Sequence, residues 1–162
     1  MDYLNSTSQT YFGHGLGLEV GNSFWFFNGT QTSQVSYFSR LTQRETSFAG
    51  RCRELWESGH IDTLHTFGNF DDGVFHRKYA EIAINELQKK DAKIPVWINH
   101  GTKNNTQNIS ADDSFQGANR DSNAYHMDIV RDVGCRYYWV GRMTHVIGQN
   151  AKRNVNIVSK TL

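Results

Sequence analysis

The chain has 162 residues, and 17 Lys and Arg against 16 Asp and Glu give it a formal net charge of +1 at pH 7. A near-neutral chain without a basic run has no general attraction for nucleic acid, so we expect no nucleic-acid partner. The length suits one domain with its own core, and no apolar run is long enough for a membrane span. The polar first ten residues do not resemble a signal peptide. We therefore expect a cytoplasmic protein, provided that no native N-terminal segment is missing.

The first half of the chain alternates strand-like and helix-like segments. Residues 18–27, "LEVGNSFWFF", predict a strand because they are rich in aromatic and β-prone residues and end at an Asn-Gly turn signal. A polar-to-helical segment, "QVSYFSRLTQ", follows. The spacing of apolar residues in "SFAGRCRELWES" then predicts a helix that Gly59 ends. "HIDTLHTF" predicts the second strand.

The second half continues this alternation. "GVFHRKYAEIAINELQKKDAK" predicts the clearest helix, with an apolar stripe and lysines in its last turn. "IPVWINHG" predicts a third strand, "SNAYHMDIVRDVG" a short helix, "CRYYWVG" a fourth strand and "NVNIV" a fifth. This order predicts βα units around a parallel sheet. The long polar loop 102–122 is of a kind that is commonly functional or disordered. Cys52 and Cys135 fit either a disulfide or small buried apolar residues.

Histidines follow several of the predicted strands. The second strand ends in "LHTFGN", the third in "INHG" and the fourth in "WVGRMTH". Because reacting groups collect at the carboxyl ends of parallel strands, we expect His65 and His100 on one rim of the sheet, facing a ligand. A neutral imidazole there can bind a divalent ion or transfer a proton.

Other polar residues of these segments have open alternatives. His126 at a helix start fits a capping or packing role as well as a substrate contact. His60 is as able to bond a backbone carbonyl as to touch substrate. Asp62 precedes the first rim histidine by three residues, so in a strand the two side chains point to opposite faces. We expect Asp71 and Asp72 to be solvated loop carboxylates.

The segment "GHIDTLHTFGN" is similar to the second motif of the polysaccharide deacetylase family, carbohydrate esterase family 4. The upstream run "GLEVGNSFWFF" resembles the family's second strand, and "VWINHG" and "GCRYYWVG" stand in the places of later barrel strands. Deacetylase-like proteins of bacterial surface-polysaccharide gene clusters look closest. By this resemblance, Gly59 and His60 form the opening pair of the motif, and His65 stands at its first metal-ligand position. Thr66 supplies the hydroxyl of the motif, and Asn69 stands at the second ligand position.

For the fold, the resemblance implies a partial or irregular (β/α) barrel with parallel strands, of the glycoside hydrolase and deacetylase type, over residues 1–162. The family's first motif, "TFDDG", precedes the second strand, and here Asp2 stands nearest to that place. The "FDDG" of residues 70–73 follows the second motif, so we interpret it as a coincidence of letters. Since a family barrel needs more than about 200 residues, we expect a truncated fragment lacking the first strand and the C-terminal part.

For the function, the resemblance implies metal-assisted hydrolysis of acetyl groups on an acetylated oligo- or polysaccharide, with a divalent ion such as Zn²⁺ as cofactor. The metal ligands would be His65, Asp2 and Asn69. Asp2 would be the ligand or the base, and His100 or His145 the acid; His145 ends "MTH", a loose counterpart of the family's closing Leu-x-His motif. The expected substrate contacts are Asp62, Trp97, Asn99, His126 and Trp139, with Tyr138 as a further ring that could stack on sugar.

Two alternatives from other classes stay open. An Asn amide oxygen is a poor zinc ligand compared with imidazole or carboxylate. Asn69 therefore fits a glycan-binding pseudoenzyme that keeps the cleft without metal. The other alternative is a metal-free glycoside hydrolase that uses carboxylates such as Asp62 with a rim partner.

Overall fold

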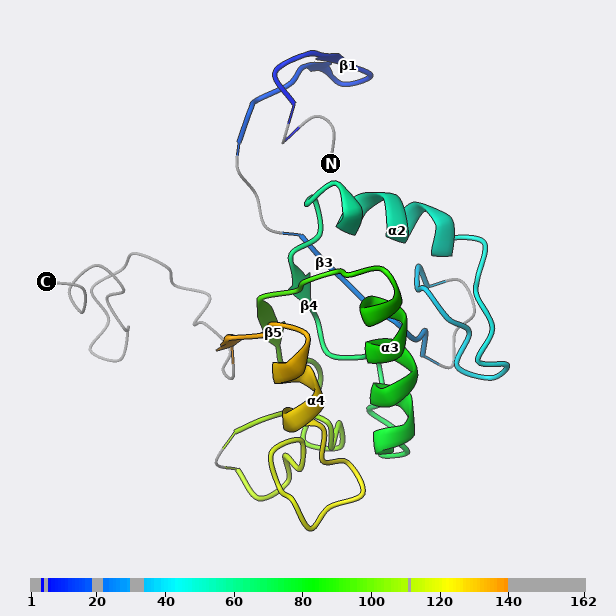
Figure 1. The fold of residues 1–162 in the computed structure, drawn as a ribbon, viewed down its shortest axis with the longest axis vertical. Helices are drawn as coiled ribbons and strands as arrows, with labels where there is room; N and C mark the ends of the chain where they lie inside the picture. The colour runs from blue at the N-terminus through cyan, green and yellow to red at the C-terminus, as the bar shows by residue number, and fades with distance from the viewer. Residues whose placement is uncertain (1–3, 5, 19–21, 30–33, 111, 140–162) are drawn as a thin grey trace, which may run out of the picture.

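The computed structural model describes residues 4, 6–18, 22–29, 34–110 and 112–139. Within these residues the chain is an α/β structure with a four-stranded, all-parallel sheet and three helices (Figure 1). The sheet strands β3 (Ser23–Phe24), β4 (Thr63–Leu64), β5 (Val96–Ile98) and β6 (Tyr137–Trp139) pair in that order. A small antiparallel hairpin, β1 (Gln9–Thr10) with β2 (Gly13–His14), precedes the sheet, and the sequence analysis did not predict it.

The strand register aligns the carboxyl ends of the four strands. Thr63 pairs with Ser23 on one side and with Val96 on the other, and Val96 pairs with Tyr137. The first four predicted strands are present, although only two or three residues of each run form the ladder. Residues that directly follow the strands therefore meet at one edge of the sheet. The predicted fifth strand, "NVNIV", lies outside the described residues.

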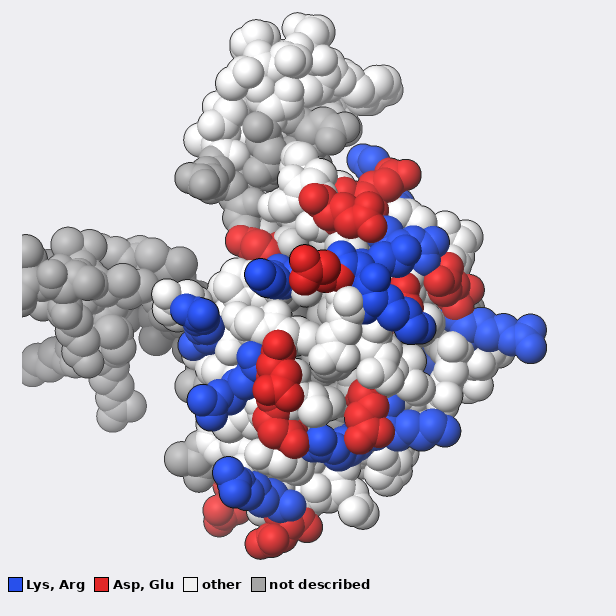
Figure 2. Space-filling model, in the orientation of Figure 1, with Lys and Arg blue, Asp and Glu red and all other residues white. Residues whose placement is uncertain are grey.

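Three helices connect successive strands: α2 (Ala49–Glu57), α3 (Arg77–Lys89) and α4 (Met127–Asp132). In Figure 1, α3 and α4 lie side by side in front of the sheet. The guanidinium of Arg77 joins the two helices by donating to both carboxylate oxygens of Asp128, at 2.8 and 2.9 Å. None of the helices in the described ranges is long and apolar enough to cross a membrane. Figure 2 shows Lys and Arg interspersed with Asp and Glu over this helical face.

The segment before α2 corrects one prediction. Residues 34–43 form no helix, and Phe38 instead makes isolated bridges to Phe27 and Glu45. The reason is burial, because Tyr37 is 0% exposed and its N–H donates to the Trp25 carbonyl at 3.2 Å. Packing against β3 thus outweighs the local helical tendency of the segment.

The core is strongly aromatic. One part, between the sheet and α2, stacks Phe24, Phe26, Tyr37 and Trp56 with ring centroids 4.8 to 5.9 Å apart. A second part lies beneath the strand ends and contains Phe67, Phe75, Trp97 and His126. Cys52 and Cys135 are both free and buried. The structure therefore shows the second alternative for the cysteines, which is that they are small buried apolar residues and do not form a disulfide.

Candidate functional site

Two histidines from neighbouring strands face each other at the carboxyl ends of the sheet. His65 directly follows β4, and His100 is the second residue after β5. Nε2 of His65 lies 3.1 Å from Nδ1 of His100, with the two ring planes 85° apart. The ring of Trp25, just past β3, has its centroid 4.7 Å from that of His100 and 5.9 Å from that of His65. We call Trp25, His65 and His100 the strand-end rim. The structure thus brings together the two histidines that the strand ends predicted.

The surroundings keep both imidazoles neutral. Burial lowers the pKa of His65 below its usual value, and the neighbouring His100 lowers it further. Burial also lowers the pKa of His100, although the negative charge of Asp71 opposes that shift. Near pH 7 each ring is therefore a neutral imidazole with one N–H and one nitrogen lone pair. Two neutral imidazoles with facing nitrogens can share a proton or offer donor atoms to a divalent ion.

The backbone after β4 is strained in a way that fixes His65. Thr66 has φ +54°, a left-handed conformation that a β-branched residue adopts only when the surroundings impose it. Its hydroxyl donates to the His65 carbonyl at 2.6 Å. Gly68 follows at φ +152°, where a Cβ would lie 2.3 Å from the carbonyl oxygen of Phe27. The close approach of the Phe27 backbone and the Thr66 hydroxyl hold this turn and so fix the position of the His65 backbone.

Amide side chains of the long polar loop fix His100. The His100 N–H donates to Oδ1 of Asn108 at 3.0 Å, and the His100 carbonyl accepts from the amides of Asn108 and Asn105 at 2.9 and 2.8 Å. Both asparagines are buried, at 1% and 0% exposure. They satisfy backbone groups that no longer have a neighbouring strand to pair with. The loop is therefore part of the structure beneath the rim, which the sequence analysis did not predict.

The Gln107 side chain likewise bonds backbone groups of the segment that follows β4. Its Oε1 accepts the Phe67 N–H at 2.8 Å, and its amide donates to the Gly68 carbonyl at 2.8 Å. Gln107 is 0% exposed. One loop thus supports the backbone behind both rim histidines.

Asp71 holds the turn that follows His100. Its Oδ1 accepts the Thr102 N–H at 2.8 Å and the Thr102 hydroxyl at 3.2 Å. Gly101, which lies between His100 and Thr102, has φ +77°. A Cβ at this position would lie 2.2 Å from Oδ1 of Asp71. The carboxylate therefore occupies the space beside the glycine and ties residues 70–73 to the His100 turn.

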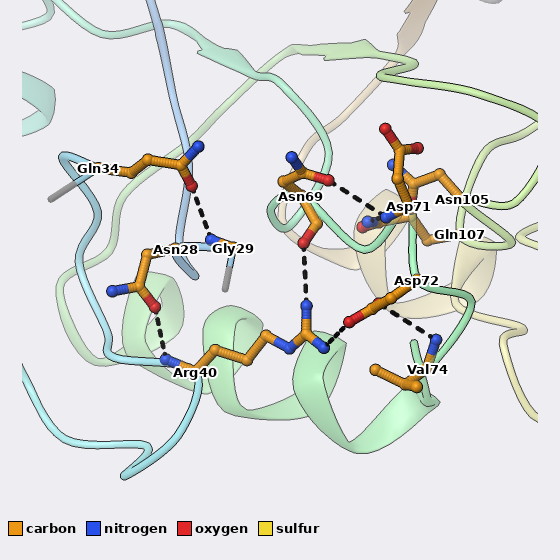
Figure 3. Close-up of polar contacts among 10 residues, drawn as sticks. All are labelled: Asn28, Gly29, Gln34, Arg40, Asn69, Asp71, Asp72, Val74, Asn105 and Gln107. Carbon is orange, nitrogen blue, oxygen red and sulfur yellow. Dashed lines mark hydrogen bonds and ion pairs between the residues drawn. The ribbon is translucent and has the colours of Figure 1, made fainter. Parts of the chain in front are cut away.

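Asp72 and Asn69 belong to a second set of contacts, drawn in Figure 3. Arg40 forms an ion pair with Asp72 and donates to the Asn69 carbonyl at 3.1 Å. Oδ1 of Asn69 accepts the Asp71 N–H at 3.2 Å. Asp71 and Asp72 are loop carboxylates with access to solvent, as expected, but each also bonds a residue about 30 positions away in the sequence. The reason is that residues 69–73 fold back between the Arg40 segment and the His100 turn.

Three of the predicted substrate contacts are used inside the molecule. Trp97 and His126 are both 0% exposed, so we place them in the core. The Trp97 indole donates to Oδ1 of Asn99 at 3.0 Å. That amide also exchanges two hydrogen bonds with the backbone of Ile109, at 2.8 and 2.9 Å. Nε2 of His126 lies 2.8 Å from the carbonyl of Gln107, which agrees with the packing reading of His126.

The remaining predicted residues lie elsewhere. Asp62 directly precedes β4, where its Oδ1 accepts the hydroxyl of Thr63 at 2.9 Å, so it lies at the opposite end of that strand from His65. His60, at the same end, has Nδ1 2.8 Å from the Ser58 hydroxyl. Trp139 ends β6 and is 44% exposed. Asp2 and His145 lie outside the described residues.

The donor set can be tested against the divalent ion that the family resemblance implies. Among the described residues, no group of three or more His, Cys, Asp or Glu is arranged to hold a metal ion. The His65 and His100 imidazoles nevertheless provide two neutral nitrogen donors 3.1 Å apart. Imidazole nitrogen is a preferred ligand of Zn²⁺. The pair therefore fits part of such a donor set.

Comparison of the chain with protein-family models, with curated proteins and with solved structures finds no match in any of the three.

Proposed function

We propose that the chain is a polysaccharide deacetylase-like protein that removes acetyl groups from sugars with the help of a divalent ion. The observation that carries this proposal is the contact of 3.1 Å between the His65 and His100 imidazoles at the carboxyl ends of β4 and β5. One of these histidines is the first ligand position of the motif "GHIDTLHTFGN". The motif resemblance and the geometry of the strand-end rim thus both support the proposal.

The order of the strands supports the fold part of the proposal. The parallel strands β3, β4, β5 and β6 are neighbours in the order of the sequence, with a helix in each connection. Doubly wound sheets reverse their strand order at a switch point, whereas consecutive strands are neighbours throughout a (β/α) barrel. We propose that the sheet is part of an irregular (β/α) barrel, with the strand-end rim at the barrel's functional face.

The chemistry follows from what the rim offers. A bound divalent ion polarises an acetyl carbonyl and lowers the pKa of a water molecule. His65 would hold this ion through Nε2, since burial keeps the imidazole unprotonated near pH 7. Trp25 is half-buried beside both imidazoles and provides an aromatic surface next to the reacting group. The proposed substrate is therefore an acetylated sugar chain that lies across the ends of β3 to β5.

Acetate release tests the proposal directly. The Zn²⁺-loaded protein is incubated with N-acetylated and O-acetylated oligosaccharides, and free acetate is measured. We expect Zn²⁺-dependent release that falls by roughly 100-fold or more in His65→Ala, beyond what loss of a supporting group usually costs. His60→Ala is the matched control, because that histidine lies before β4, and it should keep the activity. Absence of release from both substrate classes would refute the proposal.

One observation favours a second candidate, the glycan-binding pseudoenzyme. The residue at the second ligand position is an amide, and Oδ1 of Asn69 already accepts the Asp71 N–H. Calorimetry with acetylated oligosaccharides in the absence of metal separates the two candidates. Sugar binding by a protein that neither takes up Zn²⁺ nor releases acetate would favour the pseudoenzyme. Release of reducing ends without metal would instead favour a glycoside hydrolase.

A further inference from the structure

We propose that Nδ1 of His100, and not the amide of Asn69, is the second protein donor to the ion held by Nε2 of His65, an inference that rests on the proposed function. The family resemblance places the second donor four residues after the first, at Asn69. The structure instead places an imidazole from the neighbouring strand against the first donor. The ligand pair would thus bridge β4 and β5 across the rim.

The separation of the two nitrogens suits this role. Zn–N bonds of roughly 2.0–2.1 Å at a tetrahedral angle place two ligand nitrogens about 3.3 Å apart. Nε2 of His65 and Nδ1 of His100 are 3.1 Å apart. In the tautomers that place both N–H groups on the far nitrogens, a small turn of the two rings directs both lone pairs to one point beside the line that joins the facing nitrogens.

Asn69 has other contacts. Its Oδ1 accepts the Asp71 N–H at 3.2 Å, and its carbonyl accepts from Arg40 at 3.1 Å (Figure 3). These bonds hold the loop that places the Asp71 carboxylate. The amide oxygen is also the weaker zinc ligand by type. The contacts of Asn69 therefore support the loop behind the rim rather than a place in the donor set.

The backbone of His100 is held as a metal ligand requires. Asn105 and Asn108 bond its backbone groups, and Asp71 fixes Thr102 two residues further on. Ligands whose surroundings hold them in place bind metal more tightly than ligands that must first be ordered. As a donor, His100 is no longer available as the acid that the resemblance had suggested.

Zn²⁺ titration calorimetry of matched variants tests the inference. We expect the wild type to bind one Zn²⁺, and His65→Ala and His100→Ala each to weaken binding by roughly 10-fold or more. Asn69→Ala should weaken binding much less than either rim variant, because it loses only a bond that supports the loop, and His60→Ala should bind as the wild type does. Co²⁺ absorption gives a second readout, because ligand-field bands from a two-imidazole site should be lost in either rim variant and kept in the Asn69 variant. Circular dichroism checks that each variant is folded, and His100→Gln replaces the alanine variant if that one is not.

Failure of this inference and failure of the proposed function give different results. Wild-type protein that binds no Zn²⁺, or affinity that falls in Asn69→Ala and not in His100→Ala, would overturn the inference. Zn²⁺-dependent acetate release that survives His100→Ala would also overturn it while leaving the deacetylase proposal in place. Zn²⁺ binding that needs both histidines, without any acetate release, would support the inference and refute the activity.

Discussion

The two ends of the parallel sheet carry similar residues in different arrangements. Before β4, His60 bonds the hydroxyl of Ser58 and Asp62 accepts from Thr63, so the partners are two and one residues away. After β4, His65 meets His100, which is 35 residues away. All of these groups except His100 come from the one segment 58–65.

This difference shows which residues of the polar segment 58–65 a parallel sheet brings into contact with a distant part of the chain. Local pairs such as Asp62 with Thr63 need no tertiary structure. The His65–His100 contact exists because two parallel strands end at one edge, where two half-buried imidazoles with lowered pKa values face each other. Long-range contacts between ionisable groups therefore mark this end of the sheet as the candidate site.

The largest expected effect concerns the core beneath the rim. Trp97 is fully buried against Phe67 and His126, so Trp97→Ala should lower the free energy of unfolding by about 3–5 kcal/mol. Trp139, which ends β6 and is 44% exposed, is the matched control. Its alanine variant should lose less than about 1 kcal/mol. Urea denaturation measures both, and equal losses would contradict the placement of Trp97 inside and Trp139 outside.

The next effect is a pH dependence that His126 confers. Its Nε2–H donates to the Gln107 carbonyl, Nδ1 has no partner among the described residues, and burial lowers the pKa of His126 to about 4 from 6.5. The unfolded chain therefore binds more protons than the folded chain between pH 6.5 and 4. Stability is complete above pH 6.5 and falls by about 3 kcal/mol as the pH drops to 4.

Urea denaturation at pH 7 and pH 4.5 measures this pH dependence. His126→Gln removes the titrating group, so the variant should show a smaller fall in stability than the wild type. His76→Gln is the control, since His76 is exposed at the start of α3, and its variant should match the wild type. A fall of the same size in all three proteins would contradict the role of His126.

A smaller loss is expected from the amide that supports the end of β4. Gln107→Ala leaves the Phe67 N–H buried without a partner and removes one of two donors to the Gly68 carbonyl, which should cost about 2 kcal/mol. Gln88→Ala on the exposed face of α3 should change stability by less than about 0.5 kcal/mol. Thermal unfolding compares the two. A Gln107 variant as stable as the Gln88 variant would show that the loop does not support the rim.

The smallest effect separates the two neighbouring aspartates. Asp71→Ala releases the Thr102 turn beside His100, so Zn²⁺ affinity should fall by about 10-fold. Asp72→Ala breaks the pair with Arg40 and the bond from the Val74 N–H, but no contact with the His100 turn, so it should leave the affinity unchanged, with a stability loss below about 1 kcal/mol. Calorimetry of both variants decides the matter. An equal fall in affinity would mean that the loop acts as a whole and that Asp71 has no particular role.

Much of the sheet could be predicted because its signals are regular. The α3 segment shows a helical stripe, and the apolar runs around Leu64 and Trp97 lie between turn signals, so element type and order followed from periodicity. The meeting of His65 and His100 followed from one rule, that parallel strands end at a common edge.

The supports of the rim could not be predicted in the same way. Asn105, Gln107 and Asn108 look like ordinary loop residues, and their bonds to the backbone of distant strands depend on the path of the loop in three dimensions. The "FDDG" sequence did not indicate that the Asp71 carboxylate would accept hydrogen bonds from Thr102. The β1–β2 hairpin pairs only four residues, Gln9, Thr10, Gly13 and His14, which is too short for a periodic signal.

The most direct test of the strand-end rim as a Zn²⁺ site is long-range ¹H–¹⁵N NMR of the histidine rings with one equivalent of Zn²⁺. The imidazole ¹⁵N shifts report which nitrogen of each ring binds the ion. We predict that Nε2 of His65 and Nδ1 of His100 change together, while Nε2 of His126 keeps its proton. A spectrum in which only one of the two rim histidines responds to Zn²⁺, or neither does, would contradict the account.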